Sequence, residues 1–338
     1  MTRVGTAMRV DTANRYLAID GGNSKTDVVV GTGDGEVLGY ARGGGTNHQN
    51  VSLSETLSRL RDLVAQARAD AGLLAHDTFA HAEVYLAGAD LPAEVDVLAA
   101  ALAAEGWAPT LHLDNDTFAL LRAGTDAAEA VAVVCGEGIN CVGRASGGRT
   151  ARFPSLGMLS GDWGGGGHLA SLALWHAVRG EDGRGPITAL SKAAADHFGM
   201  VSAEEVGAQM HLGTVDRARL TELAPLLFDV AAGGDAVARQ IVARQVDEIV
   251  ALAIVAARRL DLLDSPFAVV LGGGVLRARH PALVEPIVDA IHAVAPKATV
   301  TVVDAPPVLG AALSALDALG SGEQAYVTLR AALARAPD

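Results

Sequence analysis

The sequence predicts an α/β protein built from two similar halves, each a mixed sheet flanked by helices, with a cleft between them. Three observations support this prediction. A pattern of strand, glycine turn and strand begins near residue 16 and begins again near residue 130. Stretches with a helical spacing of apolar residues follow each of these openings. Hydrophobic residues make up 50% of the 338 residues, which is enough to bury two cores.

The first half begins with a three-stranded meander, predicted at residues 16–20, 26–31 and 36–41, with glycines at both turns. A helix is predicted over residues 54–71, because Leu57, Leu60, Val64 and Ala67 recur on one stripe. The remaining elements expected here are a strand, a helix, a strand and a helix, at residues 82–88, 92–105, 110–113 and 117–123.

The second half repeats the meander and then alternates helices with strands. The expected strands are residues 130–135, 139–145, 150–153, 267–271 and 299–303, with helices up to residue 263 and over 280–294. We expect four segments: a disordered leader (1–14), an N-terminal domain with a polar, glycine-rich loop (15–126), a C-terminal domain (127–305) and C-terminal helices that pack back on the N-terminal domain (306–338).

Composition excludes several classes of protein. A net charge of −13 opposes binding to nucleic acid or to an anionic membrane surface. The longest apolar run, residues 249–257, is too short to cross a bilayer, and residues 1–15 lack the apolar core of a signal peptide. Two cysteines are too few for a disulfide framework and fit a reducing cytosol, so a cytoplasmic protein is expected.

Three glycine-rich turns are candidate nucleotide-binding elements, because glycine lets backbone N–H groups approach an anion closely. An ordinary hairpin turn is the alternative for each of them. The carboxylate of Asp20, at the end of an apolar strand, is costly to bury without a partner and is a candidate magnesium ligand. The candidate residues of the turns are Gly21, Gly22, Asn23, Ser24, Lys25 and Thr26, then Gly136, Glu137 and Gly138, and then Gly272, Gly273 and Gly274.

A cluster of polar residues, Asp114, Asn115 and Asp116, lies where a strand gives way to a helix. Phosphoryl transfer needs one positioned carboxylate to accept the proton of the attacking hydroxyl, and Asp114 and Asp116 are both candidates. The alternative role for any of the three is to cap the following helix. Residues 43–48 and 161–167 form two further loops with exposed polar groups and flexible backbone.

Taken together, these residues resemble the N-acetylglucosamine kinase and BadF/BcrA-type ATPase family of the sugar kinase, heat-shock 70 and actin superfamily. The resemblance covers residues 16–315. It implies duplicated ribonuclease H-like, actin-like ATPase domains, ATP and Mg²⁺ as cofactors, and a cytoplasmic homodimer. Within it, Asp116 matches the catalytic aspartate, and the positions that match sugar contacts are Thr46, Asn47, His48, Asp116, Asn140, Gly157 and Asp162. The implied reaction is transfer of the ATP γ-phosphate to the 6-hydroxyl of N-acetylglucosamine.

Three alternatives remain open at this stage. Glu137 stands where the family usually has threonine, and its carboxylate could accompany a free amine, which would make glucosamine or another hexosamine the acceptor. Relatives also include ATPase activators that hold an iron–sulfur cluster through cysteines, and Cys135 and Cys141 would be the ligands here. The third alternative is a sugar sensor without catalytic activity, although the sequence shows no helix-turn-helix extension.

Overall fold

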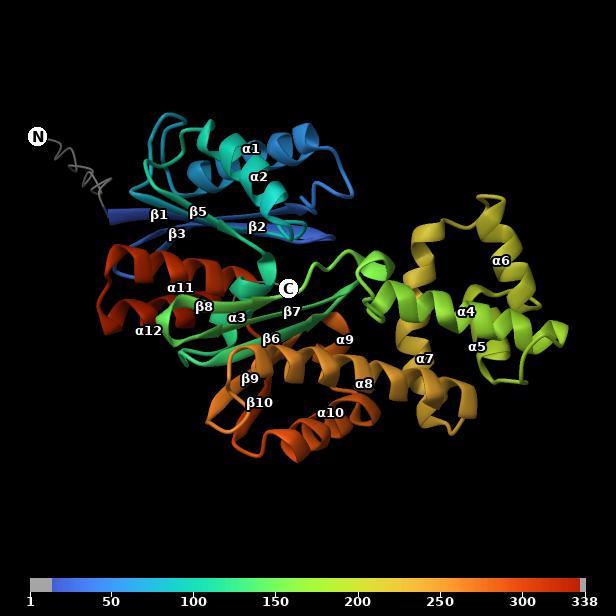
Figure 1. Cartoon of the computed structure of the whole chain (residues 1–338). Coiled ribbons are helices and arrows are strands. Elements are labelled where there is room, and N and C mark those ends of the chain that lie inside the picture. Colours follow the sequence, from blue (N-terminus) through green and yellow to red (C-terminus); the bar gives the residue numbers. More distant parts are fainter. Residues whose placement is uncertain (1–13, 335–338) are drawn as a thin grey trace, which may run out of the picture. The chain divides into compact units, whose positions relative to one another are not determined.

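The protein consists of two compact units, seen in a computed structural model that describes residues 14–334 (Figure 1). Unit 1 holds the chain up to Ala123 together with the C-terminal segment from Ala305, and unit 2 holds Gly124 to Asp304. Except for Asn14, the expected leader lies outside the described residues. Each unit contains one five-stranded mixed sheet.

The sheet of unit 1 has the strand order β3-β2-β1-β4-β5. Strands β1, β2 and β3 form an antiparallel meander, and β4 and β5 extend the sheet parallel to β1. The bounds are β1 (Arg15–Gly21), β2 (Lys25–Thr32), β3 (Val37–Gly44), β4 (His81–Leu86) and β5 (Leu111–Asp114). Every residue of β1 is buried, because helices cover both faces of the sheet.

Two helices cover one face of this sheet and two cover the other (Figure 1). One face carries α1 (Leu53–Asp70) and α2 (Pro92–Ala103); the other carries α11 (Pro307–Leu319) and α12 (Glu323–Leu333). The C-terminal helices therefore pack on the N-terminal sheet, with Leu309, Leu313 and Leu316 in a core that also includes Tyr16. Helix α3 (Asp116–Gly124) follows β5 and reaches the boundary of the unit.

Local sequence explains where these helices begin. The Ser52 hydroxyl accepts a hydrogen bond from the Glu55 N–H (3.1 Å) and so caps α1. Helices α2, α10 and α11 each have proline in the first turn, where its missing N–H costs nothing. Leu60, Val64 and Ala67 are buried, as the stripe predicts.

Unit 2 repeats the sheet topology with the order β10-β9-β6-β7-β8. Strands β6, β7 and β8 are antiparallel, and β9 and β10 extend the sheet parallel to β6. The bounds are β6 (Ala130–Cys135), β7 (Ile139–Ala145), β8 (Arg149–Arg152), β9 (Phe267–Gly272) and β10 (Ala298–Val302). Read from the first strand of each meander, the two orders coincide, which confirms the repeat predicted from the sequence.

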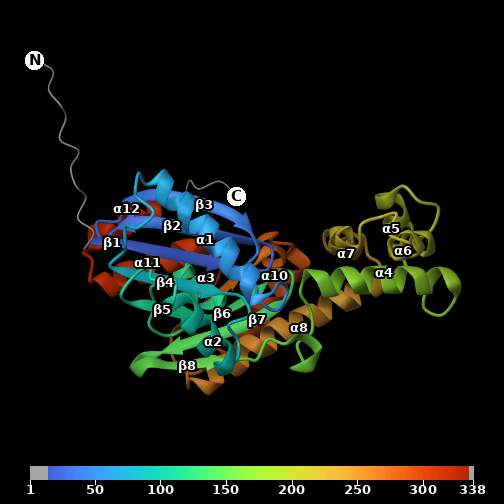
Figure 2. The ribbon, with the colours of Figure 1, turned by 90° about the horizontal axis from the view of Figure 1, so that it is seen from above.

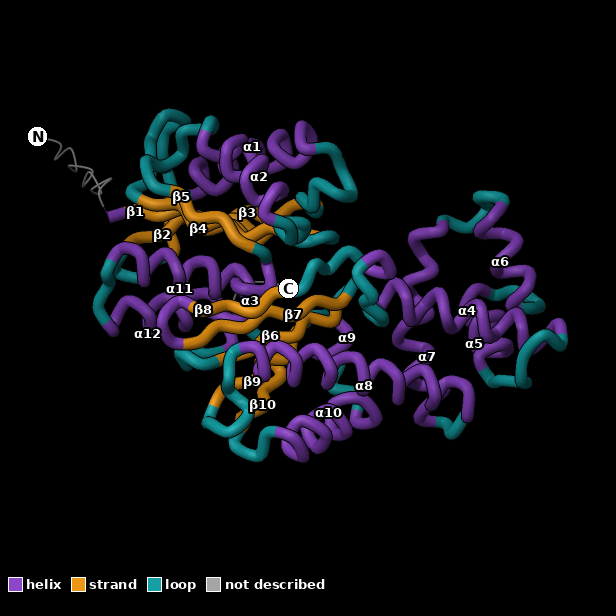
Figure 3. Tube along the Cα trace, in the orientation of Figure 1, coloured by secondary structure: helices purple, strands orange, loops and turns teal. Residues whose placement is uncertain are grey.

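The helices of unit 2 fall into two groups. Near the sheet lie α8 (Ala236–Arg259), α9 (Gly274–Arg277) and α10 (Pro281–Val294). A group without strands lies at the other end of α8, as Figures 2 and 3 show; it contains α4 (Gly166–Asp182), α5 (Leu190–Phe198), α6 (Ala203–His211) and α7 (Leu223–Ala232). Three short 3₁₀ helices complete the described chain, at Ser146–Gly148, Gly157–Leu159 and Arg217–Glu222.

Candidate functional site

The turn between β1 and β2 exposes backbone donors. Gly22 N–H donates to the carbonyl of Lys25 (2.8 Å), which closes a tight turn. Within the described chain, the N–H groups of Asn23 and Ser24 donate to no protein acceptor, and both residues are exposed. The Lys25 side chain is partly exposed beside them. This end of the turn can therefore offer two amides and one cation to an anion.

Asp20 ends β1 directly before this turn and is only 6% exposed. Burial holds the pKa of Asp20 well above its usual range, and the carboxylates of Asp116 and Asp27 act in the same direction. Lys25 and Arg42 oppose the shift without cancelling it. Among residues 14–334, no hydrogen-bond donor contacts the Asp20 carboxylate. A divalent cation would relieve this imbalance, so the residue fits a magnesium ligand.

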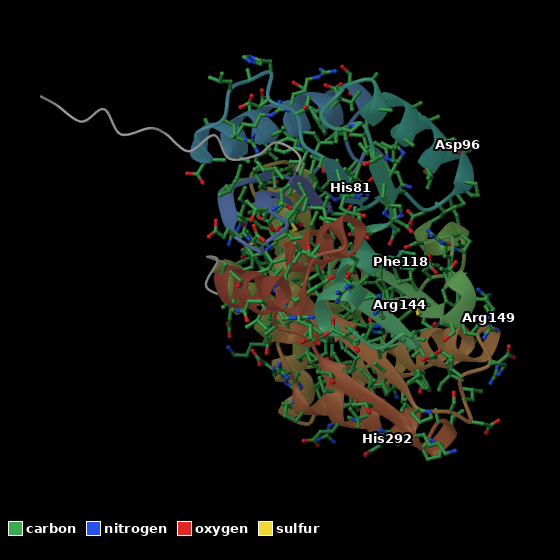
Figure 4. The ribbon with its side chains drawn as sticks, turned by 90° about the vertical axis from the view of Figure 1, so that its left-hand side faces the viewer. His81, Asp96, Phe118, Arg144, Arg149 and His292 are labelled. Atoms are coloured by element: carbon green, nitrogen blue, oxygen red, sulfur yellow. The ribbon has the colours of Figure 1, made fainter. Side chains whose placement is uncertain are left out.

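Glu83 shows what a compensated buried carboxylate looks like in the same sheet. It lies on β4 between His81, labelled in Figure 4, and His112. Its two oxygens lie 2.9 and 2.8 Å from ring nitrogens of these histidines. Burial alone would raise the pKa of Glu83, but the two hydrogen bonds hold it below its usual value. Buried acids in this unit are thus not all left without partners: Glu83 has two hydrogen bonds, whereas Asp20 has none among residues 14–334.

Asp27, on β2 just after the turn, is a charged residue that was not among the predicted site residues. Its carboxylate is completely buried and accepts from Arg42 Nε (2.5 Å) and from the Tyr40 hydroxyl (2.5 Å). Lys25 Nζ lies 4.0 Å away. Asp27 and Arg42 are directly opposite in the register of β2 and β3. This pairing depends on a β-bulge between Val30 and Gly31, so a regular hairpin pattern would not have indicated it.

Asp116 is the first residue of α3 and is partly exposed. Desolvation raises the pKa of Asp116 to about 6, against hydrogen bonds from the backbone N–H groups of Thr117 and of Asp116 itself. Asn115 takes the capping role, since its Oδ1 accepts from Thr117 N–H (2.9 Å). Asp114 Oδ1 accepts from Asn115 N–H (2.6 Å). The capping residue of α3 is therefore Asn115, and Asp116 keeps a partly exposed carboxyl at the start of the helix.

The loop after β3 lies directly on the β1–β2 turn. Thr46 N–H donates to the Gly22 carbonyl (3.1 Å), and the Thr46 hydroxyl lies 2.9 Å from that of Thr26. Thr26 and Thr46 are both completely buried. A Cβ on Gly21 would lie 2.3 Å from Thr46 Oγ1, so glycine is required there. Of the predicted sugar-loop residues, Thr46 thus bonds to the turn, and its hydroxyl is closed to solvent.

Asn47 and His48 continue this loop. Asn47 Nδ2 donates to Asn23 Oδ1 (2.7 Å), and Asn47 Oδ1 accepts from Gln49 N–H (2.9 Å). His48 Nε2 lies 3.7 Å from Glu94 Oε1, while its buried Nδ1 has no partner in the part of the chain that is described.

A polar chain, not foreseen from the sequence, joins this loop to α3. Gln49 Nε2 donates to Glu94 (2.9 Å) and to Asp90 (3.4 Å). Asp90 also accepts from Asn115 Nδ2 (2.9 Å). These residues come from three parts of the chain, near residues 49, 90–94 and 115, so spacing along the chain indicated no link between them. The asparagine that caps α3 is therefore linked through Asp90 to the loop after β3.

In unit 2, three glycine runs meet at the β6–β7 turn. Gly136 N–H donates to the Gly138 carbonyl (3.0 Å), while the exposed residues Glu137 and Gly138 have N–H groups without a protein acceptor among residues 14–334. From the second run, Gly166 N–H donates to the Gly136 carbonyl (2.7 Å) and Gly167 N–H to that of Glu137 (3.0 Å). The β6–β7 turn can thus offer two amides to an anion, whereas the second run is occupied in holding the turn.

Gly165 and Gly273 share an unusual backbone conformation and both lie close to the backbone of the β6–β7 turn. Their φ and ψ angles are 84° and 155° for Gly165 and 89° and 160° for Gly273, a region nearly closed to other residues. A Cβ on Gly165 would lie 2.6 Å from the Glu137 carbonyl oxygen, and one on Gly273 would lie 2.4 Å from that of Cys135. Gly165 directly precedes α4, and Gly273 lies between Gly272, the last residue of β9, and the start of α9. Both runs therefore brace the turn by close backbone approach.

Two side chains hold the second glycine run in turn. Gln245 of α8 is completely buried and accepts from Gly165 N–H (3.1 Å). Gly164 N–H donates to His168 Nδ1 (3.0 Å), and the His168 ring packs edge-on against Trp163 at 5.0 Å between centroids. Gln245 lies 80 residues from Gly165, so the sequence could not reveal this support.

The remaining predicted sugar contacts also lie in unit 2. Asn140, on β7, is 9% exposed, and its Oδ1 accepts from Cys141 N–H (2.7 Å). Asp162 N–H donates to the Gly157 carbonyl (3.0 Å), and Asp162 Oδ2 accepts from the Ser160 hydroxyl (2.6 Å). Gly157 and Asp162 thus belong to one internally bonded loop, with one carboxylate oxygen of Asp162 already used.

The two cysteines do not resemble cluster ligands. Cys135 and Cys141 are completely buried on neighbouring strands. Burial raises the pKa of the Cys135 thiol to about 12 and that of Cys141 further still. Iron–sulfur clusters bind thiolates, which these surroundings disfavour. Within the described range, no group of three or more His, Cys, Asp or Glu side chains could hold a metal ion, and no helix is long and apolar enough to cross a membrane.

Comparison with known proteins assigns this architecture to a family. The sequence pattern of the BadF/BadG/BcrA/BcrD ATPase family matches residues 17–315. An N-acetylmuramic acid/N-acetylglucosamine kinase of Clostridium acetobutylicum is 25% identical over 260 residues, which are 77% of this chain and 85% of that protein. An N-acetyl-D-glucosamine kinase of Dictyostelium discoideum is 24% identical over 319 residues, 89% of this chain and 98% of that protein.

Solved structures confirm the predicted fold class. A candidate N-acetylglucosamine kinase from Chromobacterium violaceum has a TM-score of 0.67 at 22% identity and covers 90% of this chain and 99% of its own. A ROK family glucokinase from Streptomyces griseus, solved with glucose and AMPPNP, has a TM-score of 0.56 at 15% identity, with coverage of 91% and 100%. At these identities the likeness establishes the fold, two mixed sheets flanked by helices, and nothing more specific.

Proposed function

Because the chain belongs to the BadF/BadG/BcrA/BcrD ATPase family, we propose that it is an ATP-dependent kinase that phosphorylates the 6-hydroxyl of N-acetylglucosamine. The single observation that carries the proposal is the state of Asp116. This partly exposed carboxyl begins a capped helix, lies near Asp20, and has a pKa raised to about 6. Two relatives that match most of this chain are kinases of N-acetylglucosamine, which supports the choice of acceptor.

In the proposed reaction Asp116 acts as general base. The sugar hydroxyl passes its proton to the Asp116 carboxylate while its oxygen bonds to the γ-phosphorus of ATP. The bond between that phosphorus and the bridging β–γ oxygen breaks, and ADP leaves with the electron pair. A pKa of about 6 keeps most of Asp116 ionised at neutral pH and still basic enough to accept the proton.

The phosphates of ATP are assigned to the two turns with unused amides. These amides belong to Asn23 and Ser24 in unit 1 and to Glu137 and Gly138 in unit 2, with Lys25 as the nearby cation. Asp20 would hold Mg²⁺, directly or through water, and the ion would neutralise phosphate charge. The third run, Gly272, Gly273 and Gly274, is assigned to the adenosine.

The acceptor is assigned to Asn47 and His48 in unit 1. The resemblance to the kinase family adds Asn140, Gly157 and Asp162 from unit 2. Thr46 belongs to the same loop as Asn47, but its hydroxyl is buried against Thr26. We therefore propose that it positions the neighbouring residues and does not contact the sugar itself. We also propose a cytoplasmic homodimer; the two free cysteines fit a reducing compartment, and light scattering on the purified protein measures the mass.

A coupled assay for ADP tests the proposal. Purified protein with Mg-ATP is offered N-acetylglucosamine, N-acetylmannosamine, glucosamine and glucose, each beside a reaction without sugar. We expect turnover that depends on N-acetylglucosamine and is lost in Asp116→Asn. Preference for glucosamine would transfer the assignment to free hexosamines, with Glu137 as the carboxylate to test. ADP release that no sugar changes would contradict the kinase assignment.

A further inference from the structure

The loop of residues 45–47 and the β1–β2 turn form one bonded body inside unit 1. Besides the bond from Thr46 N–H to the Gly22 carbonyl, the backbone approach is close: a Cβ on Gly45 would lie 1.9 Å from the Asn23 carbonyl oxygen. The proposed function assigns the turn to nucleotide and the loop to sugar. These two substrate-binding segments therefore have no solvent layer between them.

Two side-chain pairs lock this contact. Thr26 and Thr46 face each other with their hydroxyl oxygens 2.9 Å apart, and neither residue has exposed surface. Asn23 Oδ1 accepts from Asn47 Nδ2 (2.7 Å) and from Asn50 Nδ2 (3.1 Å). Since the threonine hydroxyls are closed to solvent, they can influence a ligand only through the positions of the segments that carry them.

We infer that the Thr26–Thr46 and Asn23–Asn47 pairs couple the two substrate sites, so that each substrate raises the affinity of the protein for the other. A ligand that fixes Asn23 and its amide also fixes Asn47, and the reverse follows by linkage. This inference rests on the proposed function. It assigns Thr46 as a positioning residue rather than a sugar contact.

The test is equilibrium binding by calorimetry. Binding of the non-hydrolysable nucleotide AMPPNP with Mg²⁺ is measured with and without saturating N-acetylglucosamine, and the ratio of the two dissociation constants is the coupling factor. We expect a factor of about 10 for the unaltered protein. Thr46→Val keeps the shape and removes the hydroxyl, and we expect it to lower the factor about fivefold. Thr46→Ser keeps the hydroxyl and should restore the factor.

Further variants separate coupling from stability. Ser52→Ala removes the cap of α1 just after the loop, so it should lower the melting temperature and leave the factor unchanged. Thr26→Val combined with Thr46→Val should cost no more coupling than Thr46→Val alone, because both remove one bond. Asn23→Ala, at an exposed turn, tests the other pair if the threonine variants fold poorly.

Two results would overturn the inference, and they differ from each other. If both ligands bind and the coupling factor is the same in Thr46→Val, Asn23→Ala and the unaltered protein, the coupling assignment is wrong while the kinase proposal stands. If the unaltered protein binds AMPPNP but none of the sugar, the proposed function fails and this inference falls with it.

Discussion

The two sheets share one strand order, but the turn after the first strand is stabilised by different chemistry in each. In unit 1 the turn follows Asp20, and two side-chain pairs, Thr26 with Thr46 and Asn23 with Asn47, add to a close backbone approach at Gly45. In unit 2 the turn follows Cys135 and is held by backbone, with Gly165 and Gly273 pressed against it. Repetition of the fold has therefore not repeated the contacts. In unit 1 side-chain bonds join the turn to the neighbouring loop, whereas in unit 2 the side chains of Gln245 and His168 bond to the glycine run that braces the turn.

The largest expected effect comes from Asp116→Asn. If the reactive carboxylate is in unit 1, this isosteric change should lower kcat by about 10²–10⁴ with little change in nucleotide affinity. Steady-state kinetics and calorimetry with AMPPNP measure the two quantities. Asp114→Asn is the matched control: it makes the same substitution two residues away, at the end of β5, where the proposed reaction gives the carboxyl no proton to accept, so it should change kcat far less. Equal losses in both variants would contradict the assignment.

Gly165→Ala should have the next largest effect. The new Cβ would lie 2.6 Å from the Glu137 carbonyl oxygen, and the backbone angles are nearly closed to alanine. We expect a loss of about 1–3 kcal/mol in the free energy of unfolding, together with weaker nucleotide binding. Gly138→Ala is the control, because a Cβ there meets open space. If Gly165→Ala matches Gly138→Ala in urea unfolding, the backbone brace is not needed.

Gln245→Leu tests the side-chain support of that brace. It leaves the Gly165 N–H buried without its acceptor, which should cost about 1–3 kcal/mol of stability. Gln240→Leu, at an exposed position of the same helix, should cost much less. Urea denaturation of both variants measures the difference, and a negligible effect of Gln245→Leu would show that α8 does not support the turn through this amide.

The smallest effect concerns pH and stability at Asp116. A carboxyl with a raised pKa binds its proton more tightly in the folded state than in the unfolded state. The fold therefore loses stability as pH rises from about 4 to about 6, and the loss stays constant at higher pH. Asp116→Asn should therefore raise the melting temperature at pH 7.5, and the gain should vanish by pH 4. In the unaltered enzyme kcat/KM should fall as pH drops through about 6. A gain independent of pH would contradict a raised pKa.

The sequence predicted the strands within a few residues, because runs of apolar residues mark the strands and glycine turns mark their ends. It could not predict contacts that depend on strand order. Thr46 belongs to the predicted sugar loop, and the pairing of β2 with β3 brings its buried hydroxyl against that of Thr26, a contact that spacing along the chain does not reveal. The role of the run at residues 164–167 was also hidden, since glycines that bind an anion and glycines that brace a turn look alike in sequence. The Asp27–Arg42 pair was hidden as well, because a β-bulge between Val30 and Gly31 sets its register.

The most direct test of the kinase assignment is the identity of the product. Incubation with Mg-ATP and N-acetylglucosamine, followed by ³¹P and ¹H NMR, should show a phosphate monoester on the 6-oxygen in a one-to-one ratio with ADP, and no ester with the 6-deoxy sugar. Inorganic phosphate formed in place of the ester, or an ester at another oxygen, would contradict the assignment.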